Sequence, residues 1–139
     1  MLISIKGVLT AEEVAHTLSA LKNADWADGR HSAGYLSQNV KNNQQLPDED
    51  PIASELGEVI LNALQKNAVF TASALPLKVL PPLFNRYSDN QSYGAHIDGA
   101  VRPIAGSPHR IRTDLSATLF LSDPDSYDGG ELVVNDAFG

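Results

Sequence analysis

The sequence contains no cysteine, so it has neither disulfide bonds nor a metal site built from thiolates. This absence is compatible with the cytoplasm, which is the location we expect. Basic residues are also few, since ten lysines and arginines face seventeen aspartates and glutamates, for a formal net charge of −7. Binding to nucleic acid needs clustered basic side chains. The charge therefore disfavours a nucleic-acid partner, although Arg102, Arg110 and Arg112 leave room for a small anionic ligand.

Long apolar runs are missing as well, and we expect neither a signal peptide nor a membrane-spanning segment. The chain also lacks a glycine-rich phosphate loop and a Gly-x-Ser-x-Gly nucleophile motif. These absences argue against nucleotide-binding proteins and α/β-hydrolases. With 139 residues, of which 42% are hydrophobic and 19% charged, the composition is typical of one soluble globular domain.

Two segments in the first half have the pattern of amphipathic helices. The first, residues 11–24, follows a capping box formed by Thr10 and Glu13. The second, residues 51–66, begins after Asp50 with a proline at its first position, a combination that favours a helix start. Both segments carry apolar stripes that require a surface to pack against.

After Lys78, runs of strand-forming residues alternate with turn residues. The runs cover residues 78–88, 92–97, 114–122 and 130–136. Asp128 and Gly129, between the last two runs, are a strong hairpin signal. Helices followed by strands predict an α+β fold, with an antiparallel barrel or sandwich flanked by N-terminal helices. Within a single domain, we assign residues 1–77 to the helical region and residues 78–139 to the β core.

His96 and Asp98 carry the clearest chemical signal. Side chains at positions i and i+2 of an extended segment point to the same face, so this imidazole and this carboxylate can reach one metal ion. A neutral nitrogen and an anionic oxygen are two of the three protein ligands of a non-haem Fe(II) facial triad. A His-x-Asp tripeptide occurs by chance in many chains, so the surrounding sequence decides its meaning.

Six blocks, one of which contains His96 and Asp98 themselves, are spread over nearly the whole chain and supply that context. They are Trp26-Ala-Asp-Gly-Arg30, Lys41-Asn-Asn-Gln-Gln-Leu46, Leu83-Phe-Asn-Arg-Tyr87, Tyr93-Gly-Ala-His-Ile-Asp98, Arg112-Thr-Asp-Leu-Ser-Ala-Thr-Leu-Phe-Leu-Ser122 and Tyr127-Asp-Gly-Gly-Glu-Leu132. In this order they resemble the PKHD-type hydroxylases, which are Fe(II)- and 2-oxoglutarate-dependent oxygenases of the prolyl 4-hydroxylase superfamily. The resemblance implies a double-stranded β-helix (jelly-roll) core, with iron at one mouth of the barrel and His96 and Asp98 as its first two ligands.

The same resemblance implies the reaction and its small molecules. Fe(II) is the implied cofactor, 2-oxoglutarate and dioxygen are the cosubstrates, and L-ascorbate (vitamin C) supports the cycle. The implied reaction couples oxidative decarboxylation of 2-oxoglutarate to hydroxylation of a substrate that the sequence does not identify. The family context also associates the chain with bacterial iron metabolism.

Three more residues are candidates for binding the cosubstrate. Tyr87 lies nine residues before His96, where related prolyl hydroxylases place a tyrosine that contacts 2-oxoglutarate, and a phenol can donate a hydrogen bond to a keto acid. The alternative is a tyrosine packed in the barrel wall. Ser116 and Thr118 share one face of their predicted strand and are candidates for the same cosubstrate, or else they line the barrel.

The family's third iron ligand is a second histidine on a later strand, followed by a basic residue that binds the distal carboxylate of 2-oxoglutarate. The chain reaches Gly139 without a match to either, and His109, in a loop, is the nearest stand-in. We therefore expect the sequence to correspond to the N-terminal part of the family's chain, with an incomplete barrel, weak iron binding and little turnover. The alternative is a non-catalytic jelly-roll binding module, with a structural metal or none.

Overall fold

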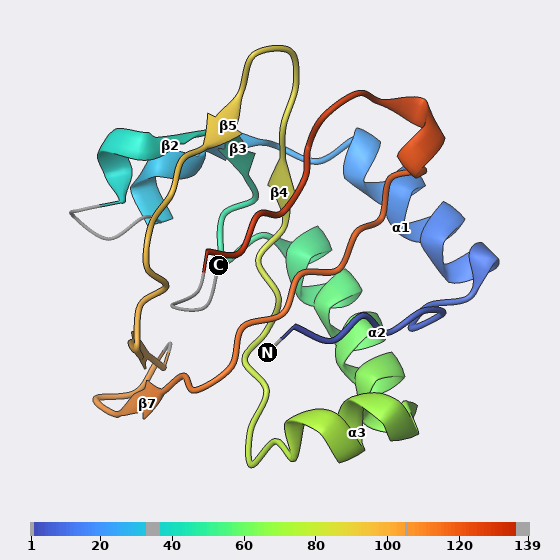
Figure 1. The fold of residues 1–139 in the computed structure, drawn as a ribbon, viewed down its shortest axis with the longest axis vertical. Helices are drawn as coiled ribbons and strands as arrows, with labels where there is room; N and C mark the ends of the chain where they lie inside the picture. Colours follow the sequence, from blue (N-terminus) through green and yellow to red (C-terminus); the bar gives the residue numbers. More distant parts are fainter. Residues whose placement is uncertain (1, 33–36, 105, 136–139) are drawn as a thin grey trace.

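The computed structural model describes residues 2–32, 37–104 and 106–135. Its α-helices are α1 (Ala11–Lys22), α2 (Pro51–Lys66) and α3 (Ala68–Ala74). Figure 1 shows these helices along one side of the molecule, with most of the short strands on the other side. No helix in the described ranges is long and apolar enough to cross a membrane.

The start of α1 is fixed by the predicted capping box. The Thr10 hydroxyl accepts a hydrogen bond from the Glu13 backbone N–H at 3.2 Å, and the Glu13 carboxylate accepts one from the Thr10 N–H at 2.7 Å. These two bonds satisfy amide groups that the first helical turn leaves without partners. The helix ends at Lys22, two residues before the predicted end.

The bounds of α2 agree with the prediction of residues 51–66. Asp50 caps it by accepting hydrogen bonds from the backbone N–H groups of Ile52 and Ala53 at 2.7 and 3.3 Å. The sequence patterns do not predict α3. It begins directly after Asn67, whose side chain accepts a hydrogen bond from the Phe70 N–H at 2.9 Å, so a short polar cap starts this helix as well.

The apolar core lies between the helices and the chain segments that lead into the strands. Its buried members are Leu9, Leu21, Leu46, Leu56, Ile60 and Phe84. Leu56 and Ile60 lie one turn apart on α2 and therefore face the same side. Leu46 and Phe84 are joined by a backbone hydrogen bond of 3.0 Å from the Leu46 N–H to the Phe84 carbonyl. The core thus connects the helices to the strands.

The strands form three small antiparallel sheets. Their bounds are β1 (Ala27–Asp28), β2 (Lys41–Asn42), β3 (Gln44–Gln45), β4 (Asn85–Arg86), β5 (Ser92–Tyr93), β6 (Val101–Pro103) and β7 (Arg110–Arg112). One sheet has the order β1–β3–β4, and the other two are the pairs β2–β5 and β6–β7. Short 3₁₀ helices cover Gly29–Ser32, Gln38–Val40 and Pro124–Ser126.

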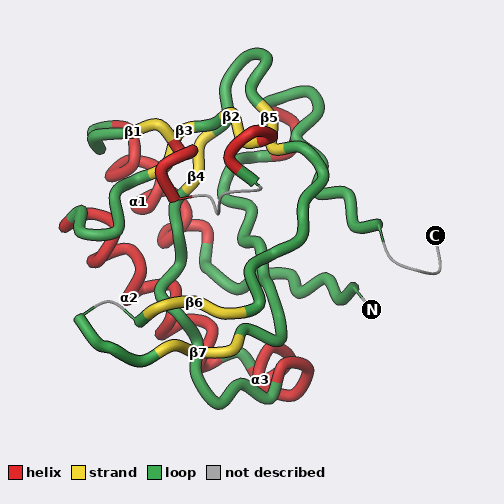
Figure 2. The backbone as a smooth tube through the Cα atoms, turned by 90° about the vertical axis from the view of Figure 1, so that its left-hand side faces the viewer, coloured by secondary structure: helices red, strands yellow, loops and turns green. Residues whose placement is uncertain are grey.

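The mixture of helices and antiparallel strands confirms the α+β prediction, but the described residues form no closed barrel. Of the predicted runs 78–88 and 92–97, only the two residues each of β4 and β5 are paired. The β6–β7 hairpin, in the lower half of Figure 2, lies outside the predicted runs.

The predictions of strands at 114–122 and 130–136 were wrong for the residues that the structure describes, which end at residue 135. Both segments run without a hydrogen-bonded neighbouring strand. Alternating apolar side chains predict an extended chain, but a strand also needs a partner backbone. Without one, apolar side chains such as Leu115 and Phe120 stay exposed, by 68% and 55%.

Replacing Leu56 with alanine tests the assignment of the core. Leu56 is 1% exposed, so Leu56→Ala should lower the free energy of unfolding by about 2–5 kcal/mol through lost burial and a residual cavity. Urea unfolding followed by circular dichroism measures the change. Leu77→Ala is the matched control, because Leu77 is fully exposed and its loss should change stability little. Equal effects of the two substitutions would contradict the assigned core.

Candidate metal centre

The pairing of β2 with β5 positions the segment that contains His96. In this pair Lys41 lies opposite Tyr93, and the Gly94 N–H donates to the Val40 carbonyl at 2.8 Å. The two backbones approach closely at Gly94, since a Cβ atom there would lie 3.1 Å from the Val40 Cβ. Beyond Gly94 the chain leaves the sheet and carries His96 to its position.

A hydrogen bond between His96 Nδ1 and the Gly94 carbonyl oxygen orients the His96 ring. Its Nδ1 lies 2.7 Å from the Gly94 carbonyl oxygen, an acceptor, so Nδ1 carries the proton that is donated. In the neutral ring, Nε2 then carries the lone pair. Such a bond from the second nitrogen to a backbone carbonyl is the usual support of a metal-binding histidine.

The lone pair on Nε2 faces Asp98. His96 Nε2 lies 3.3 Å from Asp98 Oδ1, so the two side chains lie together on one side of the segment. A neutral imidazole nitrogen and an ionised carboxylate oxygen are both acceptors, and only a proton or a cation between them makes the contact favourable. Ligands in adjacent positions of a first-row metal, each about 2.1 Å from the ion, are about 3 Å apart. The donors therefore fit two positions of a metal ion.

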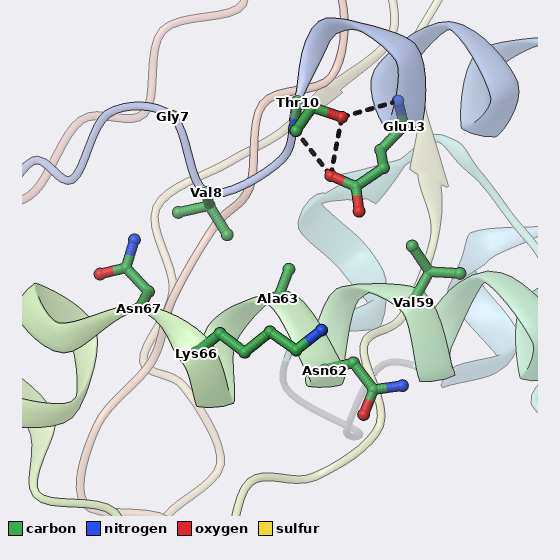
Figure 3. Close-up of a pocket in the computed structure, with 9 residues that line it drawn as sticks. All are labelled: Gly7, Val8, Thr10, Glu13, Val59, Asn62, Ala63, Lys66 and Asn67. Carbon is green, nitrogen blue, oxygen red and sulfur yellow. Dashed lines mark hydrogen bonds between the residues drawn. The ribbon is translucent and has the colours of Figure 1, made fainter.

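The pair lies open to solvent. The side chain of His96 is 23% exposed and that of Asp98 is 65% exposed. A cavity of about 440 Å³ lies between the start of α1 and the end of α2, where Figure 3 shows Glu13 hydrogen-bonded to Thr10 above Lys66. A second cavity of about 240 Å³ lies beside β1 and β3. His96 and Asp98 line neither cavity.

Tyr87, the first candidate contact of the cosubstrate, is connected to this pair through Tyr93. Burial of the phenol raises the pKa of Tyr87, a hydrogen bond with Asn43 opposes the rise, and the nearby Tyr93 phenol adds to it. Tyr93 in turn stacks on the His96 ring. Tyr87 as a whole residue is still 46% exposed, so part of its side chain faces solvent.

Ser116 and Thr118 lie in the unpaired segment that follows β7, and both are exposed. Within the described residues, neither forms a hydrogen bond with His96 or Asp98. Among the described residues, therefore, the structure shows no direct link from these two candidates to the candidate pair of His96 and Asp98.

A third protein ligand is also not found beside the pair. Among the described residues, no group of three histidine, cysteine, aspartate or glutamate side chains could hold a metal ion. His109, the stand-in considered above, begins the return arm of the β6–β7 hairpin, where its N–H donates to the Ser107 hydroxyl at 3.1 Å. The candidate centre thus offers two ligands.

The sequence patterns did not predict that Tyr93 and Lys41 lie next to each other beside His96. Lys41 is 7% exposed and donates to Gln45 at 2.8 Å. Burial lowers the pKa of Lys41, and the charge of Arg102 lowers it further. Both residues stand in the blocks that carry the family resemblance, but only the pairing of β2 with β5 puts them together.

Comparison with known proteins gives consistent matches over the entire chain. No family model matches the sequence. It is 53% identical over all 139 residues to a PKHD-type hydroxylase of Saccharophagus degradans and to one of Bordetella pertussis. It is 52% identical over the same length to PiuC, a PKHD-type hydroxylase of Pseudomonas aeruginosa. In each case the chain spans 62% of the length of the relative.

Removing either member of the pair should abolish specific metal binding. Co(II), which does not oxidise as readily as Fe(II), can be titrated into the purified chain and followed by its visible absorption. We expect weak binding to the wild-type chain and none to His96→Ala or Asp98→Ala, because one remaining ligand cannot hold the ion. His109→Ala is the control and should bind as the wild type does. A loss of binding in that variant would instead identify His109 as a ligand.

Proposed function

We propose that this chain, which is 52–53% identical over its whole length to PKHD-type hydroxylases and spans 62% of theirs, forms part of an Fe(II)- and 2-oxoglutarate-dependent dioxygenase of that family. His96 and Asp98 are the iron ligands in this proposal. The observation that carries it is the 3.3 Å contact between His96 Nε2 and Asp98 Oδ1, because two acceptors held this close need a proton or a cation between them, and a metal ion meets that need. The hydrogen bond from His96 Nδ1 to the Gly94 carbonyl keeps the lone pair of Nε2 directed at that cation.

The residues of the chain have separate tasks in the proposed reaction. Bound iron supplies the redox chemistry that couples decarboxylation of 2-oxoglutarate to hydroxylation. His96 and Asp98 hold it, the first as a neutral donor and the second as an anion that offsets part of its charge. Tyr87 donates its phenolic proton to a carboxylate or keto oxygen of 2-oxoglutarate. A phenol keeps its proton at neutral pH in any case, and burial raises the pKa of Tyr87 further.

Ser116 and Thr118 are proposed as further contacts of the cosubstrate. Both hydroxyls are exposed, and both can donate to an anionic ligand. In the complete family fold, the segment that contains them would pair as a strand of a jelly-roll, and the third iron ligand would come from the part of the family's length that this chain does not span. Residues 78–135 would then form the first strands of that barrel.

Other parts of the proposal rest on the family alone. Ascorbate as supporting reductant, a cytoplasmic location and a connection with bacterial iron metabolism stay predictions. The substrate that receives the hydroxyl group is left open, and so is the oligomeric state.

Succinate formation tests the proposed activity. The 139-residue chain and a longer polypeptide that adds the rest of the family's length are each supplied with Fe(II), ascorbate and 2-oxoglutarate. We expect succinate from the longer polypeptide, little from the chain alone, and none from the longer polypeptide carrying His96→Ala. A longer polypeptide that binds metal but forms no succinate would favour the alternative, a non-catalytic binding module.

Tyr87→Phe tests the contact with the cosubstrate. In the longer polypeptide, loss of the phenolic hydroxyl should weaken binding of 2-oxoglutarate by about 0.5–1.5 kcal/mol, the net contribution of one hydrogen bond. The half-saturating concentration of 2-oxoglutarate at saturating Fe(II) reports the change. Tyr127→Phe is the matched control, since Tyr127 is exposed to a similar extent, by 40%, and lies in the segment that follows β7. An unchanged half-saturation in Tyr87→Phe would assign Tyr87 to packing.

A further inference from the structure

Tyr93 and His96 form an aromatic stack beside the candidate metal centre. Their ring centroids are 3.7 Å apart and the ring planes differ by 13°. A parallel neighbour at this distance restricts rotation of the imidazole, because turning the ring out of plane would drive its edge into the phenol. The stack therefore fixes the plane of the imidazole.

The stack and the hydrogen bond to Gly94 constrain His96 in different ways. Rotating the imidazole by half a turn would preserve the stack but would move Nδ1 away from the Gly94 carbonyl, 2.7 Å distant. The hydrogen bond to Gly94 thus determines which edge of the imidazole ring faces the Gly94 carbonyl, whereas Tyr93 determines the plane of the ring. Together they direct Nε2 at Asp98, 3.3 Å away.

Tyr93 is itself held from the other strand of the sheet. It lies opposite Lys41 in the β2–β5 pair, and the Lys41 ammonium is 5.3 Å from the centroid of the Tyr93 ring, within the range of a cation–π interaction. Lys41 is 7% exposed and hydrogen-bonded to Gln45. The buried and hydrogen-bonded Lys41 thus supports the ring of Tyr93, and Tyr93 in turn contacts the ring of His96, which is accessible to solvent.

We propose that Tyr93 is the positioning residue of His96, with Lys41 holding Tyr93 in place. Tyr93 sets the imidazole plane so that Nε2 presents its lone pair to a divalent metal ion shared with Asp98. The phenolic hydroxyl has no part in this role, so phenylalanine should replace tyrosine without loss. The inference has two parts. The effect of Tyr93 on metal binding, which is its functional half, rests on the proposed iron site, whereas the orientation of the His96 imidazole is a property of the metal-free chain.

The metal-free chain gives the first test. Long-range ¹H–¹⁵N spectra report which imidazole nitrogen carries the proton, and ring-current shifts report the stack. At a pH at which His96 is neutral, wild type and Tyr93→Phe should show the Nδ1–H form with stack-shifted ring protons. Tyr93→Leu should gain the Nε2–H form, because without the stack the imidazole can turn away from the Gly94 carbonyl; the ring-current shift is lost with the phenol itself and tests nothing in this variant. Tyr127→Leu is the matched control and should match the wild type.

Co(II) affinity gives the second test. Tyr93→Leu should bind Co(II) about tenfold more weakly, as expected when a group that orients a ligand is removed, whereas Tyr93→Phe and Tyr127→Leu should bind as the wild type does. Lys41→Met keeps the aliphatic stem and removes the charge, and it should shift both readouts in the same direction by less. Should Tyr93→Leu not fold, Lys41→Met provides the test.

The two readouts separate the two claims. An unchanged His96 tautomer in Tyr93→Leu, together with unchanged tautomer and ring-current shift in Lys41→Met, would overturn the positioning role, whatever the metal does. Altered His96 signals in a chain that shows no His96-dependent binding of Co(II) would overturn the proposed metal site and, with it, the functional half of the inference. A loss of affinity in Tyr93→Phe as large as in Tyr93→Leu would also overturn the role assigned to the ring.

Discussion

The structure depends on one short stretch, residues 41–46, that buries alternate polar side chains. Lys41, Asn43 and Gln45 are 7%, 3% and 4% exposed, and Leu46 is 1% exposed. Buried polar groups usually find partners, and here Lys41 donates to Gln45, while Asn43 donates to Asn85 at 3.1 Å. Among the described residues, the side-chain oxygen of Asn43 is the exception, since it is buried without a hydrogen-bond partner. The same stretch supplies β2 to the two-stranded sheet that leads to the candidate metal centre, and β3 to the centre of the three-stranded sheet β1–β3–β4. Leu46 then anchors both sheets to the core between the helices.

The features that sequence predicts well here are those set by near neighbours. The capping box of α1 and the aspartate-proline start of α2 involve residues within three positions of one another, so the sequence contains nearly all the information that they need. Strand pairing is different, because the partner of a strand is distant in sequence. The strand at 114–122 is predicted from a run of strand-forming residues between turn residues, and such a run does not specify a partner.

The candidate metal centre likewise combines a feature set by near neighbours in the sequence with one set by distant residues. The closeness of His96 and Asp98 comes from a separation of two residues, which is a local property of extended chain. The contribution of Lys41 could not be predicted in this way, since Lys41 precedes Tyr93 by more than fifty residues and meets it only through the β2–β5 pair. A lysine in a polar stretch would ordinarily be assigned to the solvent. Its burial depends on the whole arrangement around residues 41–46.

The unpaired segments after β7 have a consequence for the behaviour of the molecule in concentrated solution. They combine free backbone hydrogen-bonding groups with apolar side chains, among them Leu132, Val133 and Val134, which are exposed by 54%, 72% and 54%. Extended chain of this kind is a template for the addition of a strand from another molecule. Chaperones that bind exposed apolar stretches would compete with such self-association. Self-association of the chain is therefore governed by what covers these segments, separately from any chemistry at His96 and Asp98.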